Sequence, residues 1–205
     1  MKPFCYLGRL VLGGALICLP LAMTAQTNTT PRPKAGTQEP DLAQGNRQNA
    51  SPMTASDKTF VREAAQGGMA EVQLGQLAEQ KATNPDVKKF GERMVTDHSK
   101  ANKELEQVAE RDGIPVPKKL DAKDQMLKDR LEKLSGPAFD RAYMQNMVKD
   151  HQHDVTQFEH EARDGQNTDV KEFATQTTPI LKSHLREAER VEPETTKTSA
   201  NTGMR

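Results

Sequence analysis

Apolar residues recur every three or four positions between residues 56 and 192, which is the spacing of one face of an α-helix. Capping residues, glycines and prolines divide this block into four long segments and a short one. We predict long helices over 57–82, 84–113, 135–165 and 168–191, and a short helix over 121–134. No segment alternates β-branched and polar residues as a half-buried strand does, so the pattern predicts an all-α protein.

The lengths of the connections predict how these helices pack. Short turns join the first helix to the second and the third to the fourth, whereas about 24 residues separate the second from the third. Helices joined by short turns pack as antiparallel neighbours. The sequence therefore predicts a ferritin-like four-helix bundle of two antiparallel hairpins, with a long crossover that carries the short helix. Pro179 lies inside the last helix, where it is expected to kink the helix or leave a carbonyl without a partner.

The first 25 residues have the features of a secretory signal peptide. Lys2 and Arg9 supply positive charge, and residues 10–21 form an apolar stretch that is too short to span a bilayer. A small residue, Ala25, precedes a suitable cleavage position. We therefore expect an exported protein that resides in the periplasm or is associated with the outer membrane.

Both cysteines of the chain, Cys5 and Cys18, lie in this segment, so the mature chain would carry no thiol. A chain without thiols is compatible with an oxidising compartment. Lipoprotein signals also end at a cysteine, but they need a small residue before it, and Ile17 precedes Cys18. This argues against a lipid anchor at Cys18, and we expect no transmembrane segment in the mature chain.

Composition separates a domain from its flanks. Residues 26–55 and 193–205 are polar and poor in apolar side chains, which predicts a disordered leader and a disordered tail around a domain at 56–192. The chain has 29 basic and 29 acidic residues and therefore no formal net charge. This balance argues against a nucleic-acid-binding protein.

Four ionisable residues interrupt the apolar faces of the long helices, one on each helix: Glu71, His98, His151 and His184. Antiparallel packing would bring them into one layer, since three lie close to the middle of their helices and His184 lies about one turn from the middle of its own, at 1.5 Å per residue. Three imidazoles and a carboxylate are suitable ligands for a divalent transition metal ion such as Fe, Mn, Zn or Cu. Asp97 and Asp150 lie at the borders of the same faces, where they could orient the histidines or act as further ligands.

Hydrogen bonding offers an alternative explanation of this layer. An unpaired buried carboxylate is too costly to persist, so Glu71 must be neutral, paired, hydrated or bound to a metal. Hydrogen bonds between Glu71 and the histidines would form a buried polar network that needs no metal. Neither a Gly-x-Ser-x-Gly elbow nor a glycine-rich phosphate loop occurs, and the domain has no cysteine, which favours a protein without enzymatic activity.

The domain contains five distinctive motifs: Glu71-Val-Gln-Leu-Gly75-Gln-Leu-Ala78, Met94-Val-Thr-Asp-His98, Phe139-Asp-Arg-Ala-Tyr143-Met, Met147-Val-Lys-Asp-His151, and Pro179 followed by His184-Leu. Together they resemble the domain of unknown function 4142 family, whose members are described as exported or outer-membrane proteins. The resemblance covers about residues 60–191. It implies a ferritin-like bundle in the bacterial envelope and brings no established reaction.

A di-iron centre does not follow from the ferritin-like connectivity. Di-iron carboxylate bundles place a glutamate three residues before each ligand histidine. In this chain Val95, Val148 and Leu181 occupy the corresponding positions. The sequence therefore argues against a ferroxidase-type centre and leaves a mononuclear site open.

Two functional hypotheses follow. The first is an exported envelope protein with a central metal site, for which the analogy with ferritin-like folds suggests a role in stress protection. The second is a non-catalytic structural or interaction module, in which the inward Glu/His layer is a structural polar network. A protein partner in the envelope or a homodimer is compatible with either.

Overall fold

The computed structural model describes residues 51–202. Five helices occupy this range: α1 (Ala55–Lys81), α2 (Pro85–Arg111), α3 (Ala122–Glu132), α4 (Gly136–Asp164) and α5 (Thr168–Thr202). No strand occurs within the described range, so the prediction of an all-α protein is confirmed. The predicted signal peptide and nearly all of the predicted leader lie outside the described residues.

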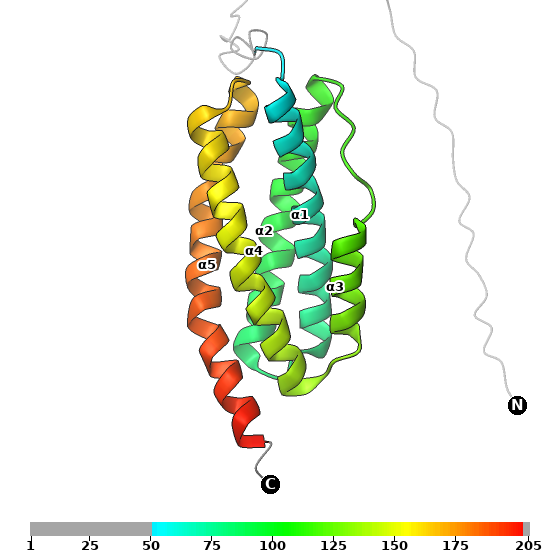
Figure 1. Ribbon diagram of the computed structural model, residues 1–205, viewed down its shortest axis with the longest axis vertical. Coiled ribbons are helices and arrows are strands. Elements are labelled where there is room, and N and C mark those ends of the chain that lie inside the picture. The colour runs from blue at the N-terminus through cyan, green and yellow to red at the C-terminus, as the bar shows by residue number, and fades with distance from the viewer. Residues whose placement is uncertain (1–50, 203–205) are drawn as a thin grey trace, which may run out of the picture. The chain divides into compact units, whose positions relative to one another are not determined.

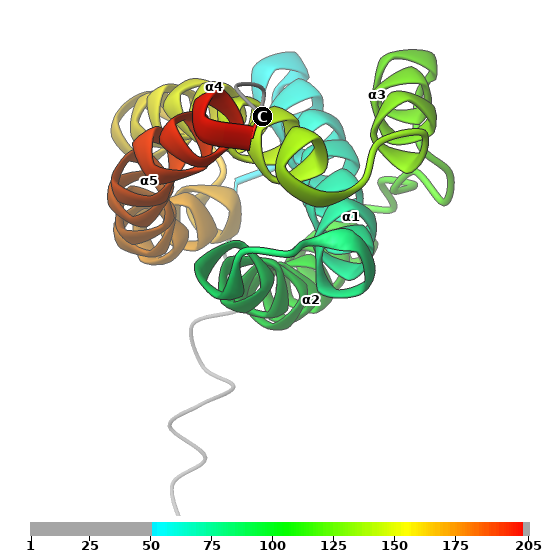
Figure 2. The ribbon, with the colours of Figure 1, turned by 90° about the horizontal axis from the view of Figure 1, so that it is seen from below.

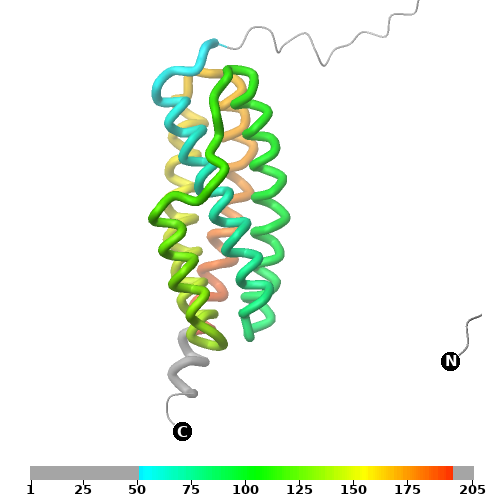
Figure 3. The backbone as a smooth tube through the Cα atoms, turned by 90° about the vertical axis from the view of Figure 1, so that its right-hand side faces the viewer, coloured from blue at the N-terminus to red at the C-terminus, as the bar shows by residue number. Residues whose placement is uncertain are grey.

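The helices form a four-helix bundle with one additional helix on its outside. α1 and α2 make one antiparallel hairpin, and α4 and α5 make the other (Figure 1). The hairpins pack together through α1 against α4 and α2 against α5, so that the four helices surround a common core (Figure 2). The crossover runs alongside the bundle before it forms α3, which packs against α1 and α4 (Figure 3). The predicted bundle of two hairpins with a long crossover is confirmed.

Polar caps begin the helices close to the predicted positions. At the start of α1, the Thr54 hydroxyl accepts from the backbone N–H of Asp57 at 3.2 Å, and the Asp57 carboxylate accepts from the backbone N–H of Thr54 at 2.7 Å. At the start of α2, the Asn84 side chain accepts from the backbone N–H of Asp86 at 2.8 Å. These bonds satisfy N–H groups that have no partner inside the helix, which is why such residues mark helix starts in the sequence.

α5 extends beyond its predicted end. The sequence places that end at Val191, before a polar segment that starts at Pro193, whereas the helix continues to Thr202. A proline inside a helix removes one N–H donor. The prediction from composition overestimated the cost of continuing the helix past this proline. Thr195 is buried, and its hydroxyl donates to the carbonyl of Glu192 at 2.7 Å, so the chain is still packed beyond the proline. The predicted end of this helix is therefore wrong.

Two apolar clusters fill the bundle. The cluster nearer the turn between α1 and α2 includes Leu74, Leu77, Val87, Phe90, Met94, Phe139, Tyr143, Met147, Ala188 and Val191. The cluster nearer the start of α1 includes Phe60, Val61, Leu105, Val108, Phe158, Val170, Phe173 and Leu181. A polar layer lies between them along each helix and contains Glu71, His98, His151 and His184, all of which are buried. The helical periodicity thus assigned these four side chains to the interior correctly.

Two glycines allow α1 and α2 to approach closely at the apolar cluster. A Cβ atom added at Gly75 would lie 2.8 Å from the carbonyl oxygen of Gly91, and one added at Gly91 would lie 2.8 Å from the Cβ atom of Ala78. Both separations are shorter than ordinary van der Waals contact. The first hairpin therefore depends on the absence of side chains at Gly75 and Gly91.

Candidate metal centre

Three helices each contribute one histidine to the polar layer: His98 from α2, His151 from α4 and His184 from α5. The ring centroids are 5.7 Å apart for His98 and His151, 5.4 Å for His98 and His184, and 5.3 Å for His151 and His184. One ring nitrogen of each histidine lies within 4.8 Å of those of the other two. Nitrogen ligands lie about 2 Å from a metal ion, so a small inward rotation of the rings would bring all three onto one ion.

Each imidazole has a buried nitrogen without a hydrogen-bond partner. These atoms are Nε2 of His98, Nε2 of His151 and Nδ1 of His184. Buried polar atoms in folded proteins almost always have a partner, because leaving one unsatisfied costs about 1–3 kcal/mol. Three such atoms in one layer are therefore a specific feature of this interior, and a shared ligand would satisfy all of them.

Hydrogen bonds to the opposite nitrogens determine the tautomers of two of these rings. Nδ1 of His151 lies 2.9 Å from the carbonyl oxygen of Met147, to which only a protonated nitrogen can donate. Nε2 of His184 donates in the same way to the Asp97 carboxylate at 2.8 Å. Asp97 also pairs with Arg93 at 3.3 Å. The remaining nitrogens, Nε2 of His151 and Nδ1 of His184, therefore carry the lone pairs that a metal requires.

The three imidazoles are neutral at physiological pH. Burial and the neighbouring His184 lower the pKa of His151 to about 3. Burial, together with His151 and His184, holds the pKa of His98 well below its ordinary value. Burial also lowers the pKa of His184, although its hydrogen bond to Asp97 opposes this effect. Protons therefore do not compete effectively with a metal for these nitrogens near pH 7.

Glu71 lies beside the histidines but faces a different side of His151. Its Oε1 atom is 3.7 Å from Nδ1 of His151, which is the nitrogen that donates to Met147, and its Oε2 atom is buried without a partner. Burial, followed by repulsion from Asp154 and Asp150, raises the pKa of Glu71 well above its ordinary value. The structure therefore brings together three of the four predicted ligands, with the fourth as a close neighbour.

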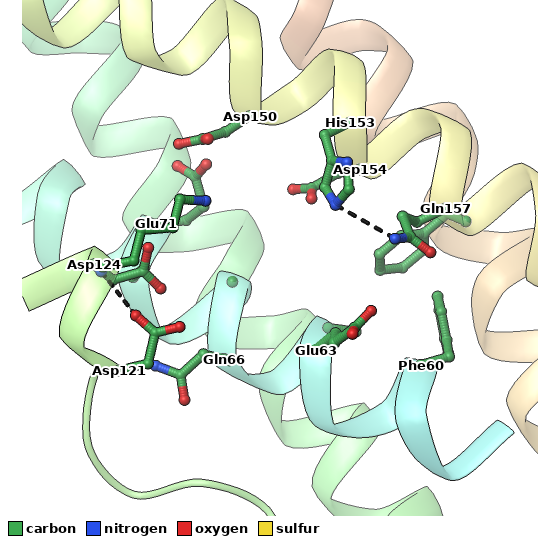
Figure 4. A pocket seen from close by; sticks show the side chains of 15 residues that line it. Phe60, Glu63, Gln66, Glu71, Asp121, Asp124, Asp150, His153, Asp154 and Gln157 are labelled. Carbon is green, nitrogen blue, oxygen red and sulfur yellow. Dashed lines mark hydrogen bonds between the residues drawn. The ribbon is translucent and has the colours of Figure 1, made fainter. Parts of the chain in front are cut away.

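An acidic pocket of about 280 Å³ adjoins Glu71 between α1, α3 and α4 (Figure 4). Its wall includes Glu71, Asp121, Asp124, Asp150 and Asp154. Asp150 thus lines this pocket and accepts a hydrogen bond from Asn146, whereas Asp97 contacts a histidine. The sequence analysis did not identify Asp124 or Asp154. The spacing of Asp150 and Asp154, one helical turn apart, is a signal that could have indicated Asp154, whereas Asp124 reaches the pocket only through the packing of α3.

The model of the family described as "Domain of unknown function (DUF4142)" matches residues 42–191. No curated protein matches the chain. Within residues 51–202, none of the helices combines the length and the apolar character that crossing a bilayer requires.

Several solved structures share the fold at low sequence identity. A DUF305 fragment from Deinococcus radiodurans has a TM-score of 0.63 at 16% identity, covering 70% of this chain and 99% of that one. A candidate secreted protein, DUF305 from Streptomyces coelicolor, has a TM-score of 0.59 at 13% identity, covering 69% and 94%. CopM in a silver-bound form has a TM-score of 0.55 at 18% identity, covering 65% and 93%. CopM in a Cu(I)-bound form also matches, with a TM-score of 0.55 at 16% identity and the same coverage.

Proposed function

This chain belongs to the DUF4142 family, and we propose that it is an exported metal-binding bundle whose three central histidines hold a transition metal ion. The observation that carries this proposal is the set of three buried ring nitrogens, one each from His98, His151 and His184, that lack any hydrogen-bond partner. Hydrogen-bonded tautomers leave the lone pairs of His151 and His184 free for coordination. A purely structural polar network would satisfy these atoms with one another, and it does not do so here.

We propose copper in its monovalent state as the preferred ion among Fe, Mn, Zn and Cu. All three donors are neutral, so the bound ion keeps its full charge inside the bundle, and burying a single charge costs less than burying two. The Glu71 carboxyl group, 3.7 Å from His151, could supply one compensating negative charge. The Cu(I)-bound and silver-bound forms of CopM, which has a similar fold, support a monovalent soft ion.

The proposed location is the periplasm or the periplasmic side of the outer membrane, and it rests on the signal-like segment at residues 1–25. A centre whose three histidines are all buried suits sequestration better than catalysis. Holding a redox-active ion away from solvent would limit its side reactions, which is the form of stress protection that we propose.

The experiment is a competitive titration of the purified protein with Cu(I) against a chromophoric chelator under anaerobic conditions. We expect one ion per chain, and at least a 100-fold loss of affinity in His151→Ala, because losing one of three nitrogens leaves only two donors. His160→Ala is the matched control, since His160 is an exposed histidine on the same helix.

The same titration with Zn(II) tests the choice of ion. Preferential binding of Zn(II) would overturn the copper assignment and preserve the site. Substoichiometric binding of both ions, equal in the wild type and in His151→Ala, would contradict the metal site and leave the histidines as a structural layer.

A further inference from the structure

The acidic pocket is lined by more acidic than basic side chains. Carboxyl groups approach it from all three of its walls: Glu71 from α1, Asp121 and Asp124 from the start of α3, and Asp150 and Asp154 from α4. Lys123 is the only lysine or arginine among the residues that line it. Burial and the neighbouring Asp150 and Asp124 raise the pKa of Asp154 to about 7, although Lys123 opposes the shift. Carboxyl groups that share a pocket repel one another when they ionise, and a cation among them would relieve this repulsion.

One buried carboxyl oxygen in the wall of the pocket has no hydrogen-bond partner. Glu71 is only 3% exposed, and its Oε2 atom has no hydrogen-bond partner. Figure 4 shows Asp124 and Asp150 on the same wall region as Glu71, and both acids, together with Asp154, repel its charge. A buried carboxyl oxygen in such surroundings requires a proton, a water molecule or a cation. The pocket is large enough for an ion that retains several water molecules.

The pocket is connected to the histidines in two places. Asp154 lines both the pocket and a narrow cavity of about 20 Å³, and His98 lines that same cavity. Glu71 lines the pocket and lies 3.7 Å from His151. Gly67 also belongs to the walls of both spaces, and a Cβ atom added there would have no heavy atom within 4 Å. The acidic pocket and the cavity beside His98 therefore share part of their walls, at Asp154 and Gly67.

We propose that the acidic pocket is the entrance through which the metal cation reaches the three histidines, with Asp154 and Glu71 at its inner end. A hydrated cation collects among the carboxylates, loses water molecules there, and passes Gly67 to the imidazole nitrogens. The carboxylates act as a low-affinity capture site, because their spacing does not bring three of them around one ion as the histidines are brought together. This inference rests on the proposed metal site and adds the route by which the site is filled.

The first test removes charge from the entrance without altering a histidine-bearing helix. Asp121→Asn/Asp124→Asn changes the lining residue that caps α3 and one within its first turn, and asparagine preserves the helix cap at position 121. The association rate of Cu(I), followed by stopped-flow quenching of tyrosine fluorescence, should fall about tenfold at low salt, since electrostatic steering contributes about 10–10³ to such rates. Added salt should slow the wild type and leave the variant nearly unchanged.

The matched control is Asp129→Asn/Glu132→Gln, which removes the same charge from exposed positions of the same helix that do not line the pocket. An equal fall in rate for control and test variants would mean that only net charge matters, and this would overturn the proposal.

The second test narrows the passage. Gly67→Leu places a side chain into the open space beside Gly67, a residue that lines both the pocket and the cavity. A passage residue should slow both association and dissociation by a similar factor of about tenfold, so that the equilibrium affinity for Cu(I) stays within about twofold of the wild type. Gly67→Ala, whose methyl group leaves most of the space open, should retain wild-type rates.

The outcomes separate the two proposals. Full-affinity binding at unchanged rates in both Gly67→Leu and Asp121→Asn/Asp124→Asn would overturn the entrance and leave the metal site intact. A wild-type protein that binds no Cu(I) or Zn(II) would overturn the metal site and the entrance together.

Discussion

At the scale of single residues, the geometry of the candidate centre depends on which ring nitrogen of a histidine already donates a hydrogen bond. His151 donates through Nδ1 to the main chain of its own helix, whereas His184 donates through Nε2 to Asp97 of α2. The two rings therefore present different nitrogens to the same space. This arrangement depends on a carboxylate from a second helix, so Asp97 orients His184 without belonging to the three-nitrogen group.

Replacement of Asp97 tests this role. Asp97→Asn weakens the acceptor for Nε2 of His184, and we expect a loss of Cu(I) affinity of about tenfold, since partners of ligand histidines typically contribute 10–100-fold. Asp86→Asn is the control, because Asp86 is another acid of α2 that forms a surface ion pair, 3.8 Å from Arg190. Competitive titration measures both. Equal affinities for the two variants would show that Asp97 does not orient a ligand.

At the scale of elements, the glycines of α1 have two different uses. Gly75 lies against the backbone of Gly91 and allows α1 and α2 to pack closely. Gly67, two turns earlier, has open space where a side chain would lie. Glycine within a helix costs stability of about 0.5–1 kcal/mol relative to alanine, so each position needs a compensating reason. Close packing supplies it at Gly75, and the proposed entrance supplies it at Gly67.

Alanine substitutions at the two glycines distinguish these uses, because they should change the free energy of unfolding in opposite directions. Gly75→Ala should lower the free energy of unfolding by about 1–3 kcal/mol, because its Cβ atom would lie 2.8 Å from the Gly91 oxygen and force the helices apart. Gly67→Ala should raise it by about 0.5–1 kcal/mol, because alanine reduces the freedom of the unfolded chain without a clash. Urea denaturation of the metal-free protein measures both values. Changes of the same sign would contradict the assignment.

At the scale of the described bundle, the polar layer and the acidic pocket beside it make stability depend on pH. Burial raises the pKa of Asp154 to about 7 and lowers that of His151 to about 3. A raised acid pKa means that the folded state keeps the proton of Asp154 to a higher pH than the unfolded state does. The contribution of Asp154 to the free energy of unfolding therefore falls as pH rises from about 4 to 7. A lowered histidine pKa acts in the opposite direction, since stability is lost as pH falls below about 6.5.

Comparison of Asp154→Asn with the wild type isolates the acidic contribution, because the histidines are common to both. The variant should gain free energy of unfolding relative to the wild type as pH rises from 4 to 7, on the order of 2 kcal/mol, and the difference should level off above pH 7. Denaturation of the metal-free proteins at several pH values measures it. Asp129→Asn, at an exposed position of α3, should show no such trend. If the free energies of unfolding of Asp154→Asn and the wild type differed by the same amount at every pH, the raised pKa of Asp154 would be contradicted.

The sequence alone was sufficient for features that depend on local interactions. Helix starts follow from residues such as Thr54 and Asn84, whose side chains bond to backbone groups a few positions away. The inward direction of Glu71 and of the histidines follows from the helical repeat. Connection lengths were enough to predict two hairpins and a crossover. The same local rules placed the end of α5 too early, because packing beyond Pro193 is not local.

Only the tertiary structure decided which inward groups meet. The histidines converge because α2, α4 and α5 have particular rotations and axial offsets, and no periodicity within one helix specifies these. Glu71 lies next to them yet faces the acids of α3 and α4, since the crossover places α3 against α1. Sequence periodicity therefore determined that each helix carries a polar group in the core. Packing between helices determined that three of these groups form a centre and that the fourth lines the pocket beside it.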